Sequence, residues 1–455
     1  MAQIVIVGAG VSGLATAAFL DGEGHDIAVV EASADAGGNV RSARVDGRVC
    51  DRAANGWLDN EPAMDRLVAR LSLQDQLLPA SDRFHSRYIY AGGRMHTAPL
   101  SAMSMATSGL LSPWEKLRVL GEPFVGRAPP DAEETVAEFV SRRLGPAFVE
   151  RMVGPMVAGI YAARPDQIAL RAAFPRMWEM EQEYGGLFRA ALRLRRGGAP
   201  RGRLTTLKEG AGQLTATIAA RLGDRLQTGE AVQAVEKRRD GWQVHTSGGA
   251  LHADAVILAA PAYAQAAMVR GLDADLAGVL DAIPYSPVAV VVSAWPAGAW
   301  DRRPDGFGVL VAGGEDLGGL LGTLFTSCIF PSHAPSDEQL MRCIIGGAVH
   351  PEAVGMDDQQ LLAQCRAAFQ KFFGEERAAP LMVKIVRHQR GIPQYAPGHL
   401  GRVRAVRAAQ SKHSGLFFTG NHLEGIGVKD CAREGEKTAQ AVLGWLGSRI
   451  SAPEV

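Results

Sequence analysis

The sequence predicts an α/β fold in which a parallel sheet is assembled from separated segments and is joined by a β-rich second domain and a helical insertion. Residues 4–31 alternate a β-branched run, a Gly-rich turn, an Ala-rich helix and a second strand. Apolar runs at 255–260 and 416–419 predict further buried strands. Residues 101–173 instead predict helices, while residues 307–347 alternate predicted strands and turns.

The turn after the first strand has the spacing of a dinucleotide-binding fingerprint. Gly8 permits a tight turn, Gly10 lets the backbone approach a pyrophosphate, and Gly13 lets the following helix pack on the strand. Ser12 lies in the same turn, at a helix N-terminus whose free N–H groups favour phosphate. Glu31 ends the next strand, where it can accept hydrogen bonds from a ribose hydroxyl. Together these residues predict a Rossmann-like nucleotide site.

A second Gly-rich turn, GGNVRS at residues 37–42, follows the ribose acid. Gly37, Gly38 and Arg41 in it resemble the corresponding motif of the amine-oxidase-like flavoproteins, in which this turn runs along the FAD pyrophosphate and the flavin ring. An ordinary surface turn is the alternative interpretation. The two turns together favour a Rossmann-like FAD-binding domain assembled from discontinuous segments.

Composition narrows the class of protein. The 455 residues suggest two or three domains, and the 48 basic and 48 acidic side chains argue against a nucleic-acid binder. The five cysteines are widely spaced and no CxxC or His-rich cluster predicts a metal site, so reduced cytosolic thiols are expected. We expect no signal peptide before the nucleotide-binding strand. No run of about 18 apolar residues predicts a membrane-spanning helix.

Two stretches are candidates for contact with a membrane surface. The apolar stretch at 103–124 has Trp114 at its middle and could rest in a membrane interface, although packing against the rest of the chain is the favoured interpretation. The stretch at 189–203 is basic and Gly-rich, which predicts a solvated loop or, alternatively, a contact with anionic lipid. Its arginines are Arg189, Arg193, Arg195, Arg196, Arg201 and Arg203.

Three longer blocks carry a more specific resemblance. They are GPMVAGIYAARPDQIALRAAFPRMWEMEQEYGG at 154–186, GIPQYAPGHLGRV at 391–403 and GNHLEGIGVKDCAREGEKTA at 420–439. With GFGVLV and LGTLFTSCIFP, they resemble the oxygen-dependent protoporphyrinogen/coproporphyrinogen oxidases of haem synthesis, over nearly the whole chain. The resemblance implies FAD-dependent, six-electron oxidation of protoporphyrinogen IX to protoporphyrin IX. Oxidation of coproporphyrinogen III to coproporphyrin III is the alternative.

The resemblance also implies how the reaction runs and where. A hydride passes from a methylene bridge of the porphyrinogen to flavin N5, molecular oxygen is the final acceptor, and hydrogen peroxide is released without a metal. No side chain is assigned as catalytic, because the hard chemistry belongs to the cofactor and the protein orients the substrate. We expect a cytoplasmic enzyme. Peripheral contact with the inner face of the cell membrane, and delivery of the product to a haem enzyme such as ferrochelatase, are further expectations.

Four residues match the family's apolar slot above the flavin. Leu310 and Leu324 match a pair of leucines that sandwich one tetrapyrrole ring, and Ile345 stands where many members have Phe. Gly159 matches a glycine whose carbonyl faces the pyrrole N–H groups. A flat macrocycle needs broad apolar walls, which these side chains can supply. Simple core packing is the alternative for each of them.

Two positions depart from the family pattern and leave the choice of substrate open. His96 stands where many protoporphyrinogen oxidases carry an Arg that pairs with a propionate, and some coproporphyrinogen-oxidising bacterial members also have His. Histidine can hydrogen-bond a carboxylate but lacks the fork and the permanent charge of Arg. Ala163 and Arg164 replace the usual Gly-Asp, so Arg164 could supply a displaced carboxylate contact or lie on the surface.

The matched blocks also imply further cofactor contacts and a division into domains. The further contacts are Val232, Gly420, Gly427 and Val428. The FAD-binding domain is expected to comprise residues 1–80, 204–275 and 391–455. The substrate domain is expected to comprise residues 81–100, 176–203 and 276–390, with residues 101–175 as the helical, membrane-associating insertion.

The sequence leaves two other classes of function open: a related flavoenzyme and a flavin-binding protein without turnover. A flavin amine oxidase should carry an aromatic cage beside the flavin, and the aliphatic residues of the slot argue weakly against one. The matched blocks likewise disfavour a carotenoid-type desaturase. A flavin-binding interaction protein without turnover is the alternative from another class, and the intact Gly-rich turns argue against it.

Overall fold

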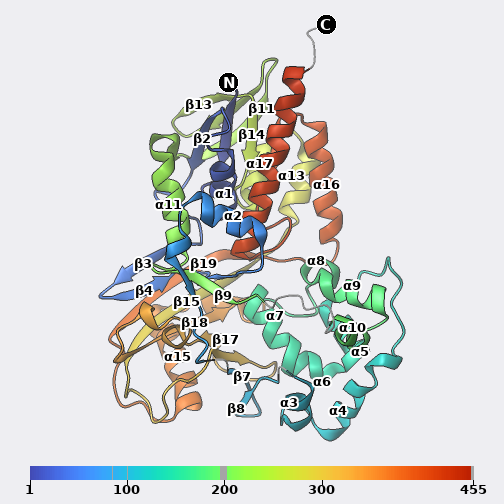
Figure 1. The fold of residues 1–455 in the computed structure, drawn as a ribbon, viewed down its shortest axis with the longest axis vertical. Coiled ribbons are helices and arrows are strands. Elements are labelled where there is room, and N and C mark those ends of the chain that lie inside the picture. The colour runs from blue at the N-terminus through green and yellow to red at the C-terminus, as the bar shows by residue number, and fades with distance from the viewer. Residues whose placement is uncertain (85, 100, 195–201, 452–455) are drawn as a thin grey trace.

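The computed structural model describes residues 1–84, 86–99, 101–194 and 202–451. Figure 1 shows an α/β part at the top, a β-rich part below it and a helical part beside the β-rich part. Arg195, Arg196 and Arg201 of the basic stretch lie outside the described residues.

The upper part is built on a five-stranded parallel sheet with the strand order β10-β2-β1-β14-β20. Its strands are β1 (Gln3–Val7), β2 (Asp26–Glu31), β10 (Leu226–Thr228), β14 (Ala255–Leu258) and β20 (Leu416–Phe418). The central strands are continuous runs of β-branched and aliphatic residues because helices or a second sheet cover both faces. The sheet therefore joins strands that lie about 400 residues apart in the chain.

Different layers cover the two faces of this sheet. One core joins it to α1, α2, α11 and α17, and the other joins it to the antiparallel β11–β13 sheet and to α12, α13 and α16. The bounds are α1 (Val11–Leu20), α2 (Pro62–Arg70), α11 (Gly212–Leu222), α17 (Val428–Ser451), β11 (Val232–Lys237), β12 (Trp242–Thr246), β13 (Gly249–Ala253), α12 (Ala262–Val269), α13 (Ala274–Asp281) and α16 (His399–Lys412). A small sheet of β5 (Trp57–Leu58), β9 (Leu204–Leu207) and β6 (Leu77–Pro79) adjoins them.

The β-rich part is a seven-stranded sheet with the order β19-β15-β18-β17-β16-β7-β8. Its strands are β7 (Arg87–Ala91), β8 (Arg94–Thr97), β15 (Tyr285–Pro296), β16 (Gly308–Val311), β17 (Leu320–Leu324), β18 (Glu338–Gly346) and β19 (Met382–Pro393). Helix α15 (Asp358–Phe373) packs on one face through an aromatic core. The hairpin β3 (Ser42–Val45) and β4 (Arg48–Asp51) packs on the other face through Cys50.

The helical part has its own apolar core, to which Val136, Phe139, Val157 and Tyr161 contribute. Its elements are α3 (Ala102–Thr107), α4 (Pro113–Leu120), η2 (Glu122–Phe124), α5 (Val136–Leu144), α6 (Pro146–Phe148), the π-helical turn η3 (Val149–Val153), α7 (Gly154–Tyr161), α8 (Leu170–Ala173), α9 (Pro175–Tyr184) and α10 (Leu187–Leu194). Shorter turns elsewhere are η1 (Gln74–Gln76), η4 (Gly223–Arg225), α14 (Thr326–Ile329), η5 (Pro331–His333) and η6 (Pro351–Gly355).

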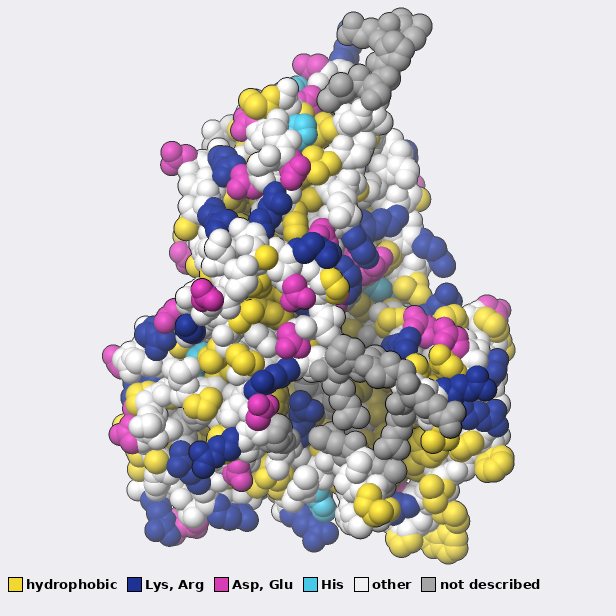
Figure 2. Space-filling view, viewed as in Figure 1, with side chains coloured by type: hydrophobic (Ala, Val, Ile, Leu, Met, Phe, Trp, Pro, Cys, Tyr) yellow, Lys and Arg dark blue, Asp and Glu magenta, His cyan; other side chains and the backbone are white. Residues whose placement is uncertain are grey.

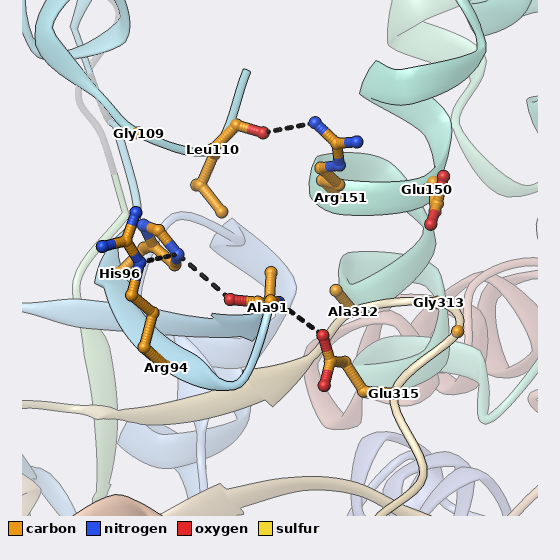
Figure 3. A pocket seen from close by; sticks show the side chains of 12 residues that line it. Ala91, Arg94, His96, Gly109, Leu110, Glu150, Arg151, Ala312, Gly313 and Glu315 are labelled. Carbon is orange, nitrogen blue, oxygen red and sulfur yellow. Dashed lines mark hydrogen bonds between the residues drawn. The ribbon is translucent and has the colours of Figure 1, made fainter. Parts of the chain in front are cut away.

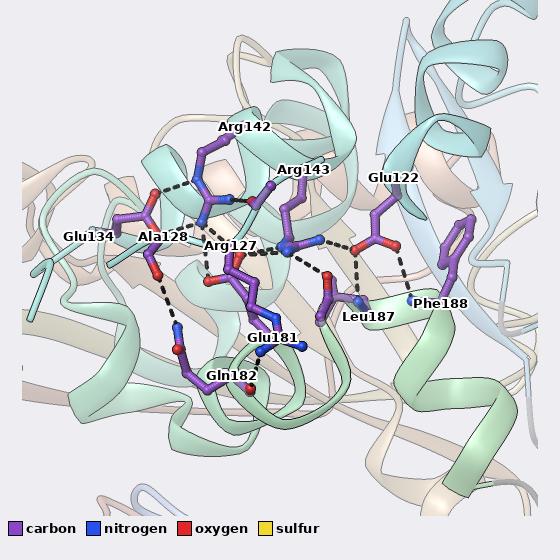
Figure 4. A network of polar contacts seen from close by, with 12 residues as sticks. Glu122, Arg127, Ala128, Glu134, Arg142, Arg143, Glu181, Gln182, Leu187 and Phe188 are labelled. Atoms are coloured by element: carbon purple, nitrogen blue, oxygen red, sulfur yellow. Dashed lines mark hydrogen bonds and ion pairs between the residues drawn. The ribbon is translucent and has the colours of Figure 1, made fainter. Parts of the chain in front are cut away.

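A buried charge network fixes the helices of this part against one another (Figure 4). Arg143, Glu122 and Glu181 are fully buried, and the Arg143 guanidinium bonds both carboxylates. Arg142 holds Glu134 through two hydrogen bonds of 2.7 and 2.6 Å. Glu122 also accepts the first backbone N–H groups of α10. Removing one member would leave a buried charge unpaired, so the network makes the arrangement of α5, α9 and α10 specific.

Two local features interrupt otherwise regular elements. Residues 42–51 form a hairpin, because Asp46 and Gly47 adopt positive φ and turn the chain. The helical residues 146–161 are interrupted by the π-helical turn before α7. Among the described residues, no helix is long and apolar enough to cross a membrane, and no group of His, Cys, Asp and Glu could hold a metal ion.

Candidate functional site

The first Gly-rich turn has the close backbone approach that the fingerprint predicts. Gly8 has φ of +104°, and a Cβ there would lie 2.8 Å from the Ala260 nitrogen of the strand-to-helix connection beside it. A Cβ on Gly13 would lie 2.0 Å from the Gly8 carbonyl oxygen. Only glycine fits at either position: the conformation and the space exclude a side chain at Gly8, and the space alone excludes one at Gly13.

Gly10 differs from these two glycines, because a Cβ there would meet nothing within 4 Å. The second Gly-rich turn lies against this position: Gly37 donates to the Ala9 carbonyl over 2.7 Å, and a Cβ on Gly38 would lie 3.2 Å from the Gly10 Cα. The two turns therefore form one backbone cradle with open space at Gly10. This space fits a pyrophosphate, as the sequence predicts.

Glu31 is held by the backbone of the same cradle. One carboxylate oxygen accepts from the Ala9 N–H over 2.7 Å and the other from the Ser33 N–H over 2.9 Å. These two hydrogen bonds fix the carboxylate at the end of β2, and each oxygen keeps a further lone pair. The carboxylate is therefore oriented for the ribose hydroxyl contact that we predict.

Two helix N-termini point to the same end of the sheet. Ser12 hydrogen-bonds the Cys431 thiol, and one turn further a Cβ on Gly435 would lie 2.8 Å from the Ala15 Cβ, so α1 and α17 run parallel in close contact. Val428 begins α17 and is buried against α1. Parallel helices add their positive ends, which favours an anion between them.

The other predicted cofactor residues surround this end of the sheet. Gly427 donates its N–H to Asp430 over 3.2 Å, which shapes the start of α17. A Cβ on Gly420 would lie 2.6 Å from the His422 ring, so glycine is required after β20. Val232 lies buried at a bulge where β11 begins. Their contacts with FAD stay a prediction.

Arginine side chains give this region an excess of positive charge. Arg41 pairs with the exposed Asp35 over 2.9 Å, but its buried Nε has no hydrogen-bond partner among the described residues. Burial, and next the charge of Arg41, lower the pKa of Arg52. The positive field of these two neighbouring guanidinium groups, one of which keeps a donor without a partner among the described residues, favours a ligand that carries negative charge. The cradle, the helix N-termini and this field all fit a dinucleotide such as FAD.

The predicted apolar slot lies on the face of the seven-stranded sheet that contacts α7. Residues paired across strands share a face, and the register places Ile344, Gly322, Leu310, Ile89 and His96 in one row. Leu310, Leu324 and Ile344 are half-buried although their chain neighbours Val309, Thr323 and Ile345 are buried. The face is therefore hollowed along this row.

Gly159 reaches the same row from α7. A Cβ on Gly159 would lie 2.7 Å from Leu310 Cδ2, and one on Gly322 would lie 3.0 Å from the same atom. Two glycines thus make room for one leucine side chain, which fits tightly against α7. The structure places Leu310, Leu324 and His96 on one face of the sheet, with Gly159 against Leu310. Their contacts with a substrate stay a prediction.

The prediction for Ile345 is wrong by one residue. Ile345 is fully buried on the opposite face, in the core that α15 covers, whereas Ile344 packs with Ala158 and Ala162 of α7. Strand side chains alternate between faces, so a shift of one residue moves a side chain to the other side of the sheet. The register could not be read from the sequence because β18 is apolar at both residues.

Arg164 is not part of the slot. It lies exposed after α7, and its guanidinium pairs with Asp166 through hydrogen bonds of 3.1 and 2.8 Å. Because this carboxylate already occupies the guanidinium, the structure favours the surface role over a substrate contact.

The row ends in a charged cavity of about 510 Å³. Figure 3 shows His96 and Arg94 on one wall, with Arg151 and Glu150 of η3 and Glu315 facing them. His96 Nε2 lies 3.1 Å from the Ala91 carbonyl oxygen. Arg94 Nε donates to the same histidine nitrogen over 3.3 Å. Sequence reasoning missed Arg94 and Arg151, because only the fold brings β8 and η3 together.

The chain is similar in sequence to known proteins. The flavin-containing amine oxidoreductase family matches residues 11–443. The chain is 29% identical over 483 residues to protoporphyrinogen oxidase 2 of Arabidopsis thaliana, covering 98% of this chain and 94% of that one. It is 26% identical over 469 residues to coproporphyrinogen III oxidase of Bacillus subtilis, covering 98% of each.

Solved structures share the fold. A chain from Exiguobacterium sp. 255-15, assigned provisionally as a protoporphyrinogen oxidase, aligns with a TM-score of 0.83 at 24% identity, covering 98% of this chain and 99% of that one. Cyclohexylamine oxidase from Brevibacterium oxydans aligns with a TM-score of 0.74 at 18% identity, covering 98% and 99%. The chain therefore belongs to the flavin-containing amine oxidoreductase family and is an FAD-dependent oxidoreductase.

Proposed function

We propose that this enzyme oxidises protoporphyrinogen IX to protoporphyrin IX, with molecular oxygen as the final electron acceptor. Relatives that the match covers to 94% and 85% of their length carry the name protoporphyrinogen oxidase, in Arabidopsis thaliana and in Nicotiana tabacum. Oxidation of coproporphyrinogen III to coproporphyrin III is the second candidate, because relatives from Bacillus subtilis and Propionibacterium freudenreichii carry that name.

The observation that carries the proposal is the row across the seven-stranded sheet. Aliphatic side chains and a glycine occupy it from Ile344 to Ile89, and His96 at its end borders the charged cavity. A porphyrinogen is a broad apolar ring with carboxylates on one edge. An apolar wall with a cationic or hydrogen-bonding end matches that division.

The residues of the slot orient the substrate and exclude water. Leu310, Leu324 and Ile344 offer aliphatic surface to the ring, while Gly159 and Gly322 pack closely against Leu310 and hold its side chain in place. His96 and Arg94 stand where a propionate can accept hydrogen bonds. FAD supplies the oxidising chemistry when bound, and the contribution of the chain to the rate is positioning.

A side-by-side assay with both porphyrinogens, followed by porphyrin fluorescence in air, tests the proposal. Preference for protoporphyrinogen supports the first candidate, and preference for the substrate with four propionates supports the second. The same assay without oxygen tests the acceptor, because porphyrin formation should stop and no hydrogen peroxide should appear. If a flavin-loaded enzyme oxidises neither substrate, the proposal fails and an amine substrate becomes the next candidate.

The enzyme is proposed to act at the cytoplasmic face of a membrane through the helical part. Figure 2 shows hydrophobic side chains gathered at the lower right edge, over this part. The most exposed large apolar side chains of α3, α4 and η2 are Met103, Trp114, Leu117, Leu120 and Phe124. Phe124 is 90% and Trp114 79% exposed, so burial inside the chain does not account for these residues.

Sedimentation with lipid vesicles tests this surface. Trp114→Ser and Phe124→Ser together should reduce the bound fraction at unchanged flavin content, whereas Leu381→Ser, which removes an exposed leucine outside the helical part, should not. Equal binding of all variants would contradict a membrane contact. Transfer of product to ferrochelatase at the same surface is proposed with it, and would appear as faster coupled haem formation on vesicles than in solution.

A further inference from the structure

Arg342 is a buried arginine on the slot face of the seven-stranded sheet. In the strand register, Arg342 lies opposite Leu324 of β17 and opposite Val292 of β15. It lies two residues before Ile344 on β18. Because strand side chains alternate, Arg342 and Ile344 point to the same side of the sheet. Only 6% of Arg342 is exposed.

The Arg342 guanidinium lacks partners. Its Nε and Nη1 are buried and have no hydrogen-bond partner among the described residues. Burial lowers the pKa of Arg342, and Asp51 is the acid that opposes this shift. An arginine stays charged in proteins, and a buried charge without a partner is strongly destabilising.

Asp51 does not supply the missing partner. Its Oδ1 accepts from the Ser42 hydroxyl over 2.5 Å and from the Ala211 N–H over 3.1 Å, and no ion pair joins it to Arg342 among the described residues. Burial also raises the pKa of Asp51 in spite of the Ser42 hydrogen bond and the Arg342 charge. The guanidinium therefore needs an acceptor that the described chain does not provide.

The surroundings of Arg342 connect it with the cofactor end. His388 lies on the same face of β19, with Nε2 3.1 Å from the Arg52 carbonyl oxygen. Burial lowers the pKa of His388, and the charges of Arg52, Arg342 and Arg41 lower it further. Arg41 belongs to the second Gly-rich turn. Arg342 thus shares its electrostatic neighbourhood with the turn that is predicted to run along the flavin ring.

The substrate carboxylates belong at the other end of the slot. His96 lies on β8, and four strand spacings separate β8 from β18 in the sheet. At about 4.8 Å per spacing, this is roughly 19 Å. A porphyrinogen propionate at the charged cavity would therefore lie far from Arg342, which leaves the flavin as the ligand with oxygen acceptors near it.

We propose that Arg342 donates hydrogen bonds to the carbonyl-bearing edge of the flavin ring and that its positive charge stabilises the reduced cofactor. Reduction adds electron density to this edge, so a fixed cation beside it favours the reduced form. Arg342 would then tune the reduction potential as well as hold the ring, and would satisfy its own donors in the loaded enzyme.

The test compares the flavin midpoint potential of purified holoenzymes, without substrate, by equilibration with a reference dye. Arg342→Gln should raise the equilibrium ratio of oxidised to reduced flavin by tenfold or more. For a two-electron couple, this corresponds to a midpoint potential about 30 mV lower. The visible spectrum of the bound flavin should change as well, because the hydrogen bonds to its ring change.

Lys384 supplies a matched control. It lies on β19 in the same row as Arg342, on the same face but exposed. Lys384→Gln removes the same charge from the sheet and should change the balance by less than twofold. If Arg342→Gln also changes it by less than twofold, the proposal is overturned. This holds even if the KM for porphyrinogen rises, since that result would assign Arg342 to a substrate carboxylate.

A second variant keeps the test decisive if Arg342→Gln does not fold. Arg342→Lys retains the charge with fewer donors, so it should change the flavin spectrum and shift the potential in the same direction by a smaller factor. An unchanged spectrum and an unchanged potential in a folded Arg342→Lys holoenzyme would overturn the proposal.

Discussion

The nucleotide end and the slot end of this molecule are built in different ways. The nucleotide cradle comes mainly from backbone within residues 8–41, where two Gly-rich turns meet through a hydrogen bond of 2.7 Å. The slot comes from side chains on strands that begin at Arg87 and end at Gly346, with α7 packed over them. A cradle of backbone depends on the absence of side chains, whereas a slot depends on the strand register and on which face each side chain occupies.

Replacing a cradle glycine should have the largest effect. Gly10→Leu should abolish FAD retention while the unloaded protein still folds, because the new side chain enters space that the chain itself leaves open. The flavin-to-protein absorbance ratio and a thermal melt measure both effects. Gly278→Leu is the control, since Gly278 is exposed on α13 and a Cβ there also meets nothing within 4 Å. Full flavin content in Gly10→Leu would contradict the cradle.

Adding a side chain at the tight contact between α7 and β16 should have the next largest effect. Gly159→Val places a side chain where Leu310 Cδ2 lies 2.7 Å from the first added carbon, so the slot should narrow. We expect kcat/KM for porphyrinogen to fall at least about tenfold, or about 1.4 kcal/mol, at unchanged flavin content. Adding Leu310→Ala to the Gly159→Val variant should restore part of the lost kcat/KM. Without any fall, Gly159 does not border the substrate.

The corrected register of β18 predicts opposite effects for two neighbouring residues. Ile345→Ala should lower stability by about 2–5 kcal/mol because Ile345 is fully buried in the core beneath α15. Ile344→Ala should cost less stability, since Ile344 is half-buried, and should raise the KM for porphyrinogen several-fold. Denaturant unfolding and steady-state kinetics separate the two. The reverse pattern would restore the original assignment of Ile345.

His96 should give the smallest effect. His96→Ala removes one hydrogen-bonding group at the charged cavity while Arg94 and Arg151 remain, so the KM for porphyrinogen should rise about two- to fivefold, equivalent to a net hydrogen bond of about 0.5–1 kcal/mol. Flavin content should not change. His252→Ala, on the exposed face of β13, is the control. An unchanged KM would remove His96 from the substrate site.

Much of the fold could be predicted because local signals were strong. The Gly-rich turns, β1, β2, β20 and α17 are marked by residues that lie next to one another in the sequence. The strand β19 and the helices α15 and α16 were not predicted. For α15 a local signal exists, because Asp357 and Gln360 form a capping box at its start. The boundaries between the seven predicted domain segments stay a prediction.

The amino-acid sequence by itself determined the nucleotide end, because the positive φ of Gly8, the close contact of Gly13 with Gly8 and the hydrogen bonds of Glu31 all lie within one βαβ unit. Only the tertiary structure decided the slot end. Whether Ile344 or Ile345 faces the substrate depends on a pairing register in which a shift of one residue exchanges the two faces. Arg342 shows the same limit: its charge is visible in the sequence, but its burial without a partner follows from strands brought together across the sheet.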